Sequence, residues 1–293
     1  MSNLELTEEP ADYHTNYLSG ISHSMLNTFR KSITDFHKKY VLKQWDNDRV
    51  PAFDFGTAFH AYCLERDLFW EKVAVKPAHD KRSKANREAW DAWEAESQRK
   101  AWVSASEMES IEKMAEVVMD DSEASRWAFG LKGINEKMIA WQSDGEGTSG
   151  VRCSLKCKPD RYLSAADNPY LDGVDVVVDL KTTNSVTPDE MAKSAAVFGY
   201  HCQAALYRMG ATTLSGRPAR HISVFISKKS PYEVATVEYS EKALQVGDEM
   251  NAVTIAEMAD CMSYEKYTGR LANRLTTLDL PPWFYSQWDR RKE

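Results

Sequence analysis

The sequence has 293 residues, of which 43% are hydrophobic, 28% charged and 11% aromatic, enough apolar material for one large domain or two small ones. No run of about 18 apolar residues occurs, which excludes a membrane-spanning helix, and no basic and apolar leader opens the chain, so we expect a cytoplasmic protein with no membrane partner. The formal charge of -7 argues against a passive nucleic-acid coat protein, which is usually basic.

The five cysteines are odd in number and widely scattered, which argues against a disulfide framework. Cys153 and Cys157 are four residues apart in a segment that alternates like a strand. They would share a face but lie about 13 Å apart, too far for two ligands of one zinc ion. We interpret these cysteines as small buried apolar residues.

The first part of the chain is predicted to be helical. Residues 1–20 are polar and acidic, and we expect a mobile or loosely docked segment. Ser22 is predicted to cap a helix whose apolar residues recur at helical spacing as far as Val41. After a loop at 45–51, helices are predicted over 56–70, 85–101 and 104–129. The last of them begins with the capping-box pair Ser104 and Glu107.

Strand patterns begin at Gly133. The segments INEKMIAWQ and VRCSLKCKPDRYL, joined by DGEGTSG, predict an antiparallel hairpin. The segment VDVVVDLKTT predicts a strand that is buried on both faces. Two helices, two strands and a long amphipathic helix are then expected, over 188–197, 200–213, 221–228, 232–240 and 241–267.

These elements predict a mixed α/β fold with a helical N-terminal half. We expect a single domain over 21–293 that follows the polar segment 1–20. Its parts are a mostly helical region (21–130), a sheet core that carries the chemistry (131–240), and a C-terminal helix with an aromatic and basic tail (241–293).

Two carboxylates and a lysine form the strongest chemical pattern. Asp160 ends one predicted strand and Asp179 lies near the end of the next, where strand ends can bring two carboxylates to one metal ion. Lys181 is two residues beyond Asp179 and points to the same side of the strand. A lone Asp-x-Lys is usually a solvated pair, but the apolar run 176–178 predicts burial here, which is costly for charges that neither pair nor bind metal.

This set suits phosphodiester hydrolysis, in which a metal ion activates water and neutralises charge on the phosphate. Lys181 could orient the water, help to deprotonate it, or stabilise the developing charge, and the sequence does not choose among these roles.

The order Pro159, Asp160, Asp179, Lys181 resembles the PD-(D/E)XK nuclease motif. Three further pieces resemble the RecB-like branch, and most of all the RecE-like (exodeoxyribonuclease VIII) exonucleases. They are the opening helix ISHSMLNTFRKSITDFHKKYVL, the G-x-x-x-H pattern at 56–60 and the Q-x-x-x-Y pattern at 203–207. The resemblance spans residues 21 to 207 in the family's order. It implies a restriction-endonuclease-like core, in which helices flank a central mixed sheet.

The resemblance implies roles for particular residues. Asp160 and Asp179 would be metal ligands and Lys181 the catalytic lysine. His60 would be a further ligand, together with the backbone carbonyl of Leu180. The expected metal is Mg²⁺, with Mn²⁺ as an alternative that imidazole suits well.

Three more residues carry implied roles with simpler alternatives. Glu136 matches an acidic position of the family, but could be a surface residue beside Lys137. Gln203 and Tyr207 share a helical face and would contact Lys181 or a substrate phosphate, although Tyr207 could be a core residue. His60 could likewise be structural, as most histidines in amphipathic helices are.

Two cofactors are not expected. Some relatives bind an iron–sulfur cluster through a Cys-Pro pair and a C-terminal cysteine cluster. Here Lys31-Ser32-Ile33 stands at the first place and no C-x-x-C follows, so we expect no iron–sulfur centre. No G-x-x-x-x-G-K-[ST] loop is present either, so no ATP-driven motor is expected.

Two basic groups are candidates for DNA contact. Arg152, Lys156 and Lys158 alternate along one predicted strand and, with Arg161, could form a phosphate track into the site. A second group holds Lys81 and Arg82, followed by basic residues 84 and 87. The simpler interpretation of this second group is a solvated helix face.

The favoured hypothesis is a metal-dependent exonuclease that acts 5′→3′ on linear double-stranded DNA and leaves 3′ single-stranded tails for recombination. The direction is implied by the resemblance, as are a single-strand annealing recombinase as partner and a ring-shaped homo-oligomer around DNA. One alternative is an endonuclease of restriction or repair type on the same core. Another is a non-catalytic DNA-binding protein that retains the fold.

Overall fold

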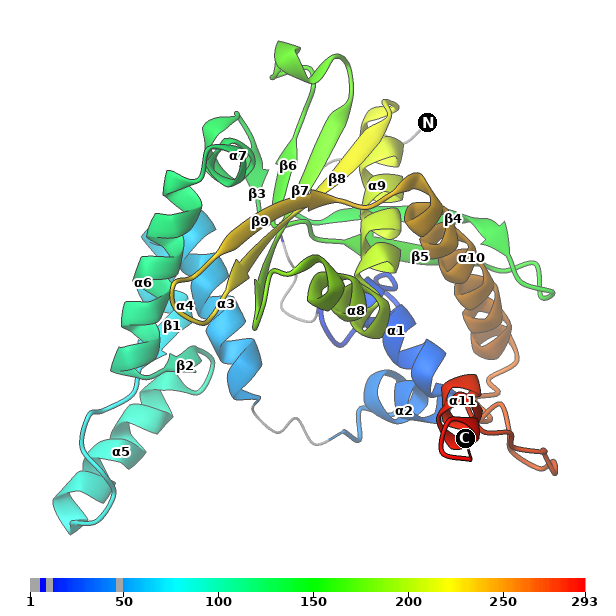
Figure 1. Cartoon of the computed structure of the whole chain (residues 1–293), viewed down its shortest axis with the longest axis horizontal. Coiled ribbons are helices and arrows are strands. Elements are labelled where there is room, and N and C mark those ends of the chain that lie inside the picture. The colour runs from blue at the N-terminus through cyan, green and yellow to red at the C-terminus, as the bar shows by residue number, and fades with distance from the viewer. Residues whose placement is uncertain (1–5, 9–12, 46–49, 293) are drawn as a thin grey trace.

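The computed structural model describes residues 6–8, 13–45 and 50–292 (Figure 1). A five-stranded sheet in the order β3-β6-β7-β8-β9 forms its centre. β7 and β8 are parallel, and the other neighbours are antiparallel. The strands are β3 (Ile134–Asn135), β6 (Arg161–Leu163), β7 (Asp175–Thr183), β8 (Ala219–Ser227) and β9 (Val234–Glu238). The expected mixed α/β architecture with a central mixed sheet and flanking helices is confirmed.

Two further pairs of strands lie outside this sheet. The antiparallel pair comprises β4 (Ile139–Glu146) and β5 (Arg152–Cys157). The parallel pair comprises β1 (Val73–Val75) and β2 (Ala101–Val103). The sequence analysis missed β1 and β2 because three-residue strands are too short to show a period.

Helices cover both faces of the central sheet. On one face α3 (Pro51–Leu64), α6 (Ala105–Asp120) and α7 (Ser122–Ser125) pack in a core that includes alternate residues of β7 and β8. On the other face α1 (His23–Lys31), α9 (Tyr200–Ser215) and α10 (Glu241–Ser263) form a second core with β4 and β5. The remaining helices are α2 (Ile33–Phe36), α4 (Phe69–Lys72), α5 (Lys84–Ser97), α8 (Pro188–Phe198) and α11 (Pro282–Asp289).

Local chemistry explains where the helices begin and end. Pro51 and Pro188 occupy first-turn positions of α3 and α8, where the missing N–H costs no hydrogen bond. The predicted capping box at the start of α6 is present, with Ser104 and Glu107 each bonding the other's backbone. Gly199 ends α8 with a φ of +72°, a left-handed conformation that glycine adopts without steric cost.

Several predicted elements differ from the structure. The helix expected over 104–129 ends at Asp120 and is followed by the short α7, and the helices expected over 85–101 and 241–267 end at Ser97 and Ser263. The helix expected over 22–41 breaks at Ser32, whose extended backbone and side chain cap α2. The helix expected over 56–70 begins at Pro51 and ends at Leu64. The second hairpin strand stops at Cys157, since Pro159 lacks the N–H that a strand ladder needs, and β6 joins the central sheet instead.

β7 is the element that positions the site. Val176, Val178 and Leu180 enter the core of α3 and α6, whereas Val177 enters the core of α9 and α10. Side chains alternate along a strand, so Asp179 and Lys181 point to the same face as Val177.

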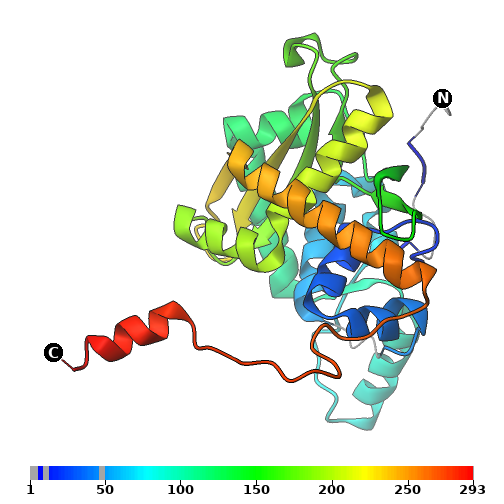
Figure 2. The ribbon, with the colours of Figure 1, turned by 90° about the vertical axis from the view of Figure 1, so that its right-hand side faces the viewer.

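The last part of the chain leaves the folded body. After α10, Tyr267 and Arg270 still contact the N-terminal helical region, and residues 271–281 then carry α11 away from the rest of the molecule, as Figure 2 shows. No helix within the described ranges is long and apolar enough to cross a bilayer.

Candidate active site

Asp179 and Lys181 form an ion pair near the end of β7. Both side chains are enclosed, with 3% of the Asp179 side chain and 15% of the Lys181 side chain exposed. The strand before them is fully buried, so each charge depends on the other or on a further partner in the site.

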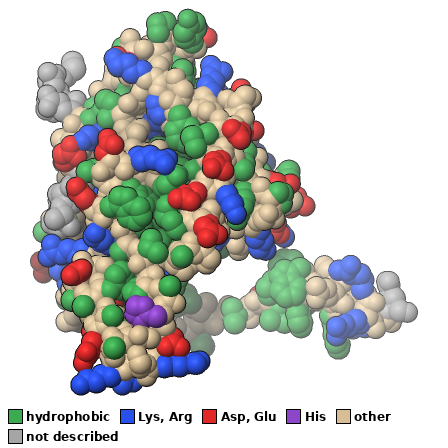
Figure 3. All heavy atoms as spheres, turned by 90° about the vertical axis from the view of Figure 1, so that its left-hand side faces the viewer, with side chains coloured by type: hydrophobic (Ala, Val, Ile, Leu, Met, Phe, Trp, Pro, Cys, Tyr) green, Lys and Arg blue, Asp and Glu red, His purple; other side chains and the backbone are tan. Residues whose placement is uncertain are grey.

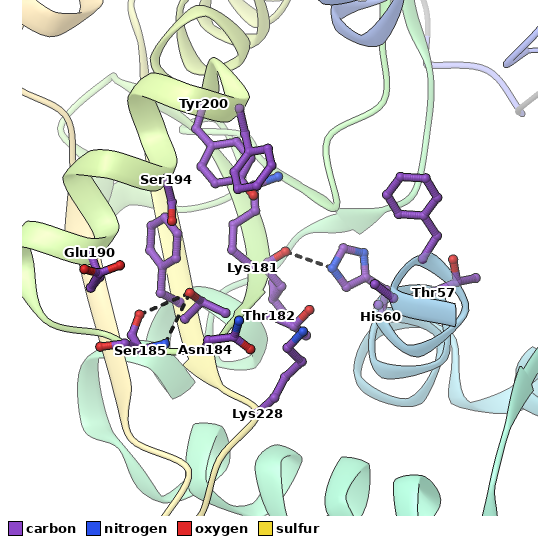
Figure 4. Close-up of a pocket in the computed structure, with 17 residues that line it drawn as sticks. Thr57, His60, Lys181, Thr182, Asn184, Ser185, Glu190, Ser194, Tyr200 and Lys228 are labelled. Atoms are coloured by element: carbon purple, nitrogen blue, oxygen red, sulfur yellow. Dashed lines mark hydrogen bonds between the residues drawn. The ribbon is translucent and has the colours of Figure 1, made fainter. Parts of the chain in front are cut away.

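Asp160 lies between β5 and β6, beside the backbone of β7. Its Oδ2 accepts a hydrogen bond of 2.6 Å from the Leu180 N–H, and its Oδ1 lies 3.5 Å from His60 Nδ1. His60 projects from α3, and its Nε2 lies 2.8 Å from the Leu180 carbonyl oxygen (Figure 4). The structure therefore joins Asp160 and His60 through the backbone of Leu180.

Glu136 completes this group from the residue after β3. Its φ of +56° is a left-handed conformation, which is unfavourable for a residue with a β-carbon and is held here by the surroundings. The Glu136 N–H donates a 3.1 Å hydrogen bond to the Asp160 carbonyl, and its carboxylate lies 2.5 Å from Lys158 Nζ. The backbone turn thus places the Glu136 carboxylate next to Asp160.

His60, Glu136 and Asp160 together have the donor atoms of a metal site. One ligand atom from each lies within 4.8 Å of the others. Two carboxylate oxygens suit Mg²⁺, and an imidazole nitrogen adds a preference for Mn²⁺. This donor set fits a divalent cation. Asp179 lies outside this group and is paired with Lys181, so its role as a ligand stays a prediction.

The charge states in the site follow from burial and close pairing. Burial raises the pKa of Asp160 to about 7. His60 lowers this pKa, and the negative charge of Asp179 raises it further. Burial would also raise the pKa of Asp179, but Lys181 holds it below its ordinary value. Burial disfavours the Lys181 ammonium, yet Asp179 and Asp160 raise its pKa above the ordinary value. Lys181 is therefore a cation at neutral pH.

Helix α9 supplies three residues that hold Lys181 in place. Lys181 Nζ donates a 3.0 Å hydrogen bond to Gln203 Oε1, and Gln203 Nε2 donates a 3.1 Å bond to the Tyr207 hydroxyl. The Lys181 ammonium also lies 4.9 Å from the centre of the Tyr200 ring. Positions 200, 203 and 207 share one face of α9, so one helix fixes the direction of the ammonium.

A cavity of about 580 Å³ opens onto His60, Leu180 and Lys181. Figure 4 shows that its walls come from α3, from the end of β7 and from the start of α9. The lining includes aromatic rings, hydroxyl groups and the second cation Lys228. A substrate in this cavity would therefore reach both Lys181 and the edge of the candidate metal site.

Comparisons with known proteins agree with this arrangement. The model of the family described as "PDDEXK-like domain of unknown function (DUF3799)" matches residues 22–272. The chain belongs to this family. No curated protein matches the sequence significantly.

Among solved structures, this PDDEXK-like chain is similar to a protein from Eubacterium rectale that is provisionally named an exonuclease. The TM-score is 0.61 with 13% identity, and the match covers 96% of this chain and 98% of that one. At this identity the likeness indicates a shared fold. A phage-related exonuclease from Haemophilus somnus 129PT, also 13% identical, covers 65% of this chain and 92% of its own, but its TM-score is only 0.28.

The PDDEXK-like domain gathers most of the predicted site residues in one place. They are Lys181, Asp179, Asp160, Glu136, Gln203, Tyr207, His60 and the backbone of Leu180. The sequence analysis missed Tyr200, although its spacing from Gln203 and Tyr207 was a usable signal. It also missed His221, a buried histidine of β8 that helps to lower the pKa of Asp179. Strand pairing brings His221 close to the site, and no local pattern reveals such pairing.

The prediction that Lys156 contacts DNA phosphates is wrong. This lysine is fully buried, and its ammonium donates hydrogen bonds of 2.9 Å to the Asn16 carbonyl and 3.2 Å to Ser19 Oγ. Residues 13–20, part of the segment that was expected to be mobile or loosely docked, enclose it. Lys156 therefore has no surface to offer DNA.

The expectation also fails at Arg161, which is 7% exposed and whose guanidinium donates to the carbonyls of Ala128 and Leu131. Lys158 is part of the site as the partner of Glu136. Arg152 is exposed on β5, and its contact with DNA stays a prediction.

The second basic group lies beside the protruding helix α5 (Figure 1). Lys81 pairs with Glu94 at 2.8 Å and lies over the Trp90 ring, whereas Arg82 pairs with its near neighbour Asp80. The Arg82 side chain is 91% exposed, and a role for this group in DNA contact stays a prediction.

Proposed function

We propose that this chain is a metal-dependent DNA exonuclease that acts 5′→3′ on linear duplexes and leaves 3′ single-stranded tails for recombination. The observation that supports hydrolysis most is that a lysine and a set of possible metal ligands lie next to each other at one cavity. A constrained lysine, Lys181, lies beside a donor set of His60, Glu136 and Asp160. The choice of exonuclease, its direction and its recombination role rest on the resemblance to RecE-like enzymes.

Mg²⁺ bound by His60, Glu136 and Asp160 would activate water and neutralise phosphate charge. Lys181 acts as a cation, because its raised pKa keeps it protonated at neutral pH. We therefore assign to it the stabilisation of charge on the phosphate and the orientation of water rather than removal of a proton. Gln203, supported by Tyr207, keeps the ammonium aimed at the cavity.

The proposed partners follow from the same resemblance. Double-stranded DNA ends are the proposed substrate, and a single-strand annealing recombinase would receive the 3′ tail. A ring-shaped homo-oligomer would keep the enzyme on DNA, and all of this would take place in the cytoplasm.

The test uses a linear duplex labelled at either the 5′ or the 3′ end, with Mg²⁺, Mn²⁺ or EDTA. Wild type should release 5′-terminal nucleotides first and only with metal. Lys181→Ala should lower the rate by about 10²–10³-fold, since one group that stabilises the transition state contributes roughly that much. Lys113→Ala, which removes an exposed lysine of α6 outside the cavity lining, is the matched control and should cleave normally.

A covalently closed circular duplex separates the alternatives. Nicking of the circle with metal would favour the endonuclease, and equal cleavage by wild type and Lys181→Ala would refute the assigned site. Binding of DNA without cleavage under any metal would favour the non-catalytic protein.

A further inference from the structure

The cavity beside Lys181 has a second cation, Lys228, whose charge is not neutralised by a carboxylate. Lys228 follows β8 and lines the cavity. Its backbone N–H donates a 2.8 Å hydrogen bond to the Thr183 carbonyl, which fixes the start of its side chain at the end of β7, two residues beyond Lys181. Among the residues that the structure describes, Lys228 takes part in no ion pair, whereas Lys181 is paired with Asp179. Such a cation in a concave site attracts an anion.

The charges in the cavity differ from those on the outer surface. Figure 3 shows basic side chains interspersed with acidic ones over the face that α5 and α6 form. In the cavity, the acidic side chain of the lining, Glu190, is paired with Lys193 at 2.9 Å. The lining therefore keeps Lys228 as an excess positive charge, which suits the phosphate group of a nucleotide.

Aromatic rings form another part of the cavity wall. Phe53 lies in the first turn of α3 and is 74% exposed. Phe198 ends α8, is 51% exposed, and stacks on the Tyr200 ring with the two ring centroids 5.6 Å apart. All three rings line the cavity. Rings that are open to water beside a cation have the composition of a site that stacks nucleobases.

Helix α3 connects the Phe53 ring to the candidate metal site. Phe53, Thr57 and His60 follow the i, i+4, i+7 spacing of one helix face, and all three line the cavity. Phe53 thus lies two turns, about 10 Å along the axis, before the histidine that faces Asp160. Figure 4 shows Thr57 and His60 on α3 across from Lys181 and Tyr200. A base held at Phe53 would therefore belong to a nucleotide next to the phosphate at the metal site.

The size of the cavity limits what enters it. Its volume of about 580 Å³ lies within the range of roughly 300–1,000 Å³ for sites that hold one small molecule. One nucleotide whose base has left the duplex suits such a volume, as in enzymes that act on a flipped base. A stacked duplex end with its two backbones is far larger than this cavity.

We propose, on the basis of the nuclease function above, that this cavity binds one unpaired nucleotide of the cleaved strand. Its base lies between Phe53 and the stacked rings of Phe198 and Tyr200, and its phosphate binds Lys228. Every base has a flat face that stacks, so the site accepts all four bases but requires that the base be present and unpaired. The terminal base pair of a duplex therefore opens before its strand reaches Lys181.

The test measures binding of a fluorescently labelled oligothymidylate in EDTA, which removes the metal needed for cleavage. A series of these oligonucleotides lacks the base of one residue at a time. Wild type should bind one abasic member of the series about 5–150-fold more weakly, which corresponds to the stacking of one base. Phe53→Ala/Phe198→Ala should bind the intact oligonucleotide equally weakly and show no further loss with that abasic member.

The phosphate contact is tested in the same assay. Lys228→Ala should lower the slope of log affinity against log salt concentration by about 1, the value for one lost phosphate contact. A methylphosphonate removes the charge of one phosphate. At one position it should weaken binding by wild type and leave binding by Lys228→Ala unchanged.

Matched controls come from outside the cavity lining. Tyr170→Ala removes a ring that is 83% exposed, and Lys113→Ala removes an exposed lysine of α6; both should bind like wild type. Phe53→Leu/Phe198→Leu keeps apolar bulk but removes the flat rings. It should bind as weakly as the alanine variant, which separates stacking from a change in folding.

Three outcomes would overturn the proposal. They are no binding of the intact oligonucleotide by wild type, losses from the aromatic variant and the abasic residue that add at every position, and equal salt dependence of Lys228→Ala and wild type. The assay contains no cleavage step. A chain that binds as expected but does not cleave end-labelled DNA would therefore refute the proposed function alone, and a chain that cleaves but shows additive losses would refute the nucleotide site alone.

Discussion

Replacing Asp160 with asparagine should stabilise the metal-free protein at alkaline pH. Asp160 is buried and beside other carboxylates, which raises its pKa to about 7. Asparagine can still accept the Leu180 N–H through its side-chain oxygen, the bond that Asp160 Oδ2 now makes. The substitution therefore removes an unfavourable charge while it keeps the hydrogen bond.

The magnitude and its sign follow from linkage. The unfolded chain loses the Asp160 proton near pH 3.8, but the folded chain keeps it until about pH 7. The free energy of unfolding of wild type therefore falls as pH rises between these two values. At pH 8 the loss is roughly 4 kcal/mol, at pH 5 it is roughly 2 kcal/mol, and below about pH 3 it is absent.

The measurement is thermal unfolding of wild type and Asp160→Asn in EDTA at pH 5 and pH 8. At pH 8 the variant should unfold on the order of 5–10 °C above wild type, and at pH 5 the difference should shrink. Mn²⁺ should stabilise wild type and leave the variant almost unchanged, since asparagine is a poorer ligand. Equal melting temperatures of the two proteins at both pH values would refute the idea that an unfavourable charge is buried at Asp160.

Three further outcomes are expected. Lys181→Ala should stop cleavage yet bind Mn²⁺ with affinity within a few-fold of wild type, as measured by calorimetry, because the lysine is not among the grouped metal donors. Tyr207→Phe should lower kcat by about tenfold with little change in KM, because it frees Gln203 to turn away from Lys181; a change in KM alone would contradict a positioning role. Lys156→Met should destabilise the fold by about 1–3 kcal/mol in urea, since the Asn16 carbonyl and Ser19 Oγ each lose the hydrogen bond that the buried ammonium donates. The salt dependence of DNA binding should be unchanged in Lys156→Met, and a shallower slope would show that the lysine does reach phosphate.

Strand β7 and the positions of Asp179 and Lys181 on it were predictable because the pattern lies within one short segment. The apolar run Val176–Val178 predicts a buried strand, and the two-residue spacing of Asp179 and Lys181 places both side chains on one face of that strand. Helical spacing likewise places Gln203 and Tyr207 on one face of α9. Each of these relations follows from a period within one element.

The errors arise where burial depends on segments distant in sequence. Lys156 follows the strand pattern of an exposed basic face, but the segment before α1 folds over it. Arg161 satisfies the carbonyl groups at the end of a helical segment about thirty residues earlier. The position of the Glu136 carboxylate depends on a left-handed backbone conformation, which the neighbouring sequence does not predict. Such contacts are set by tertiary packing, which periodicity does not describe.

Strand β7 contributes to the site from both of its faces at once. Its backbone at Leu180 meets His60 of α3, which belongs to one apolar core, while Lys181 meets α9, which belongs to the other. The candidate site thus lies where the two apolar cores meet at β7, so we expect a substitution that repacks either core to shift His60 and Lys181 relative to each other.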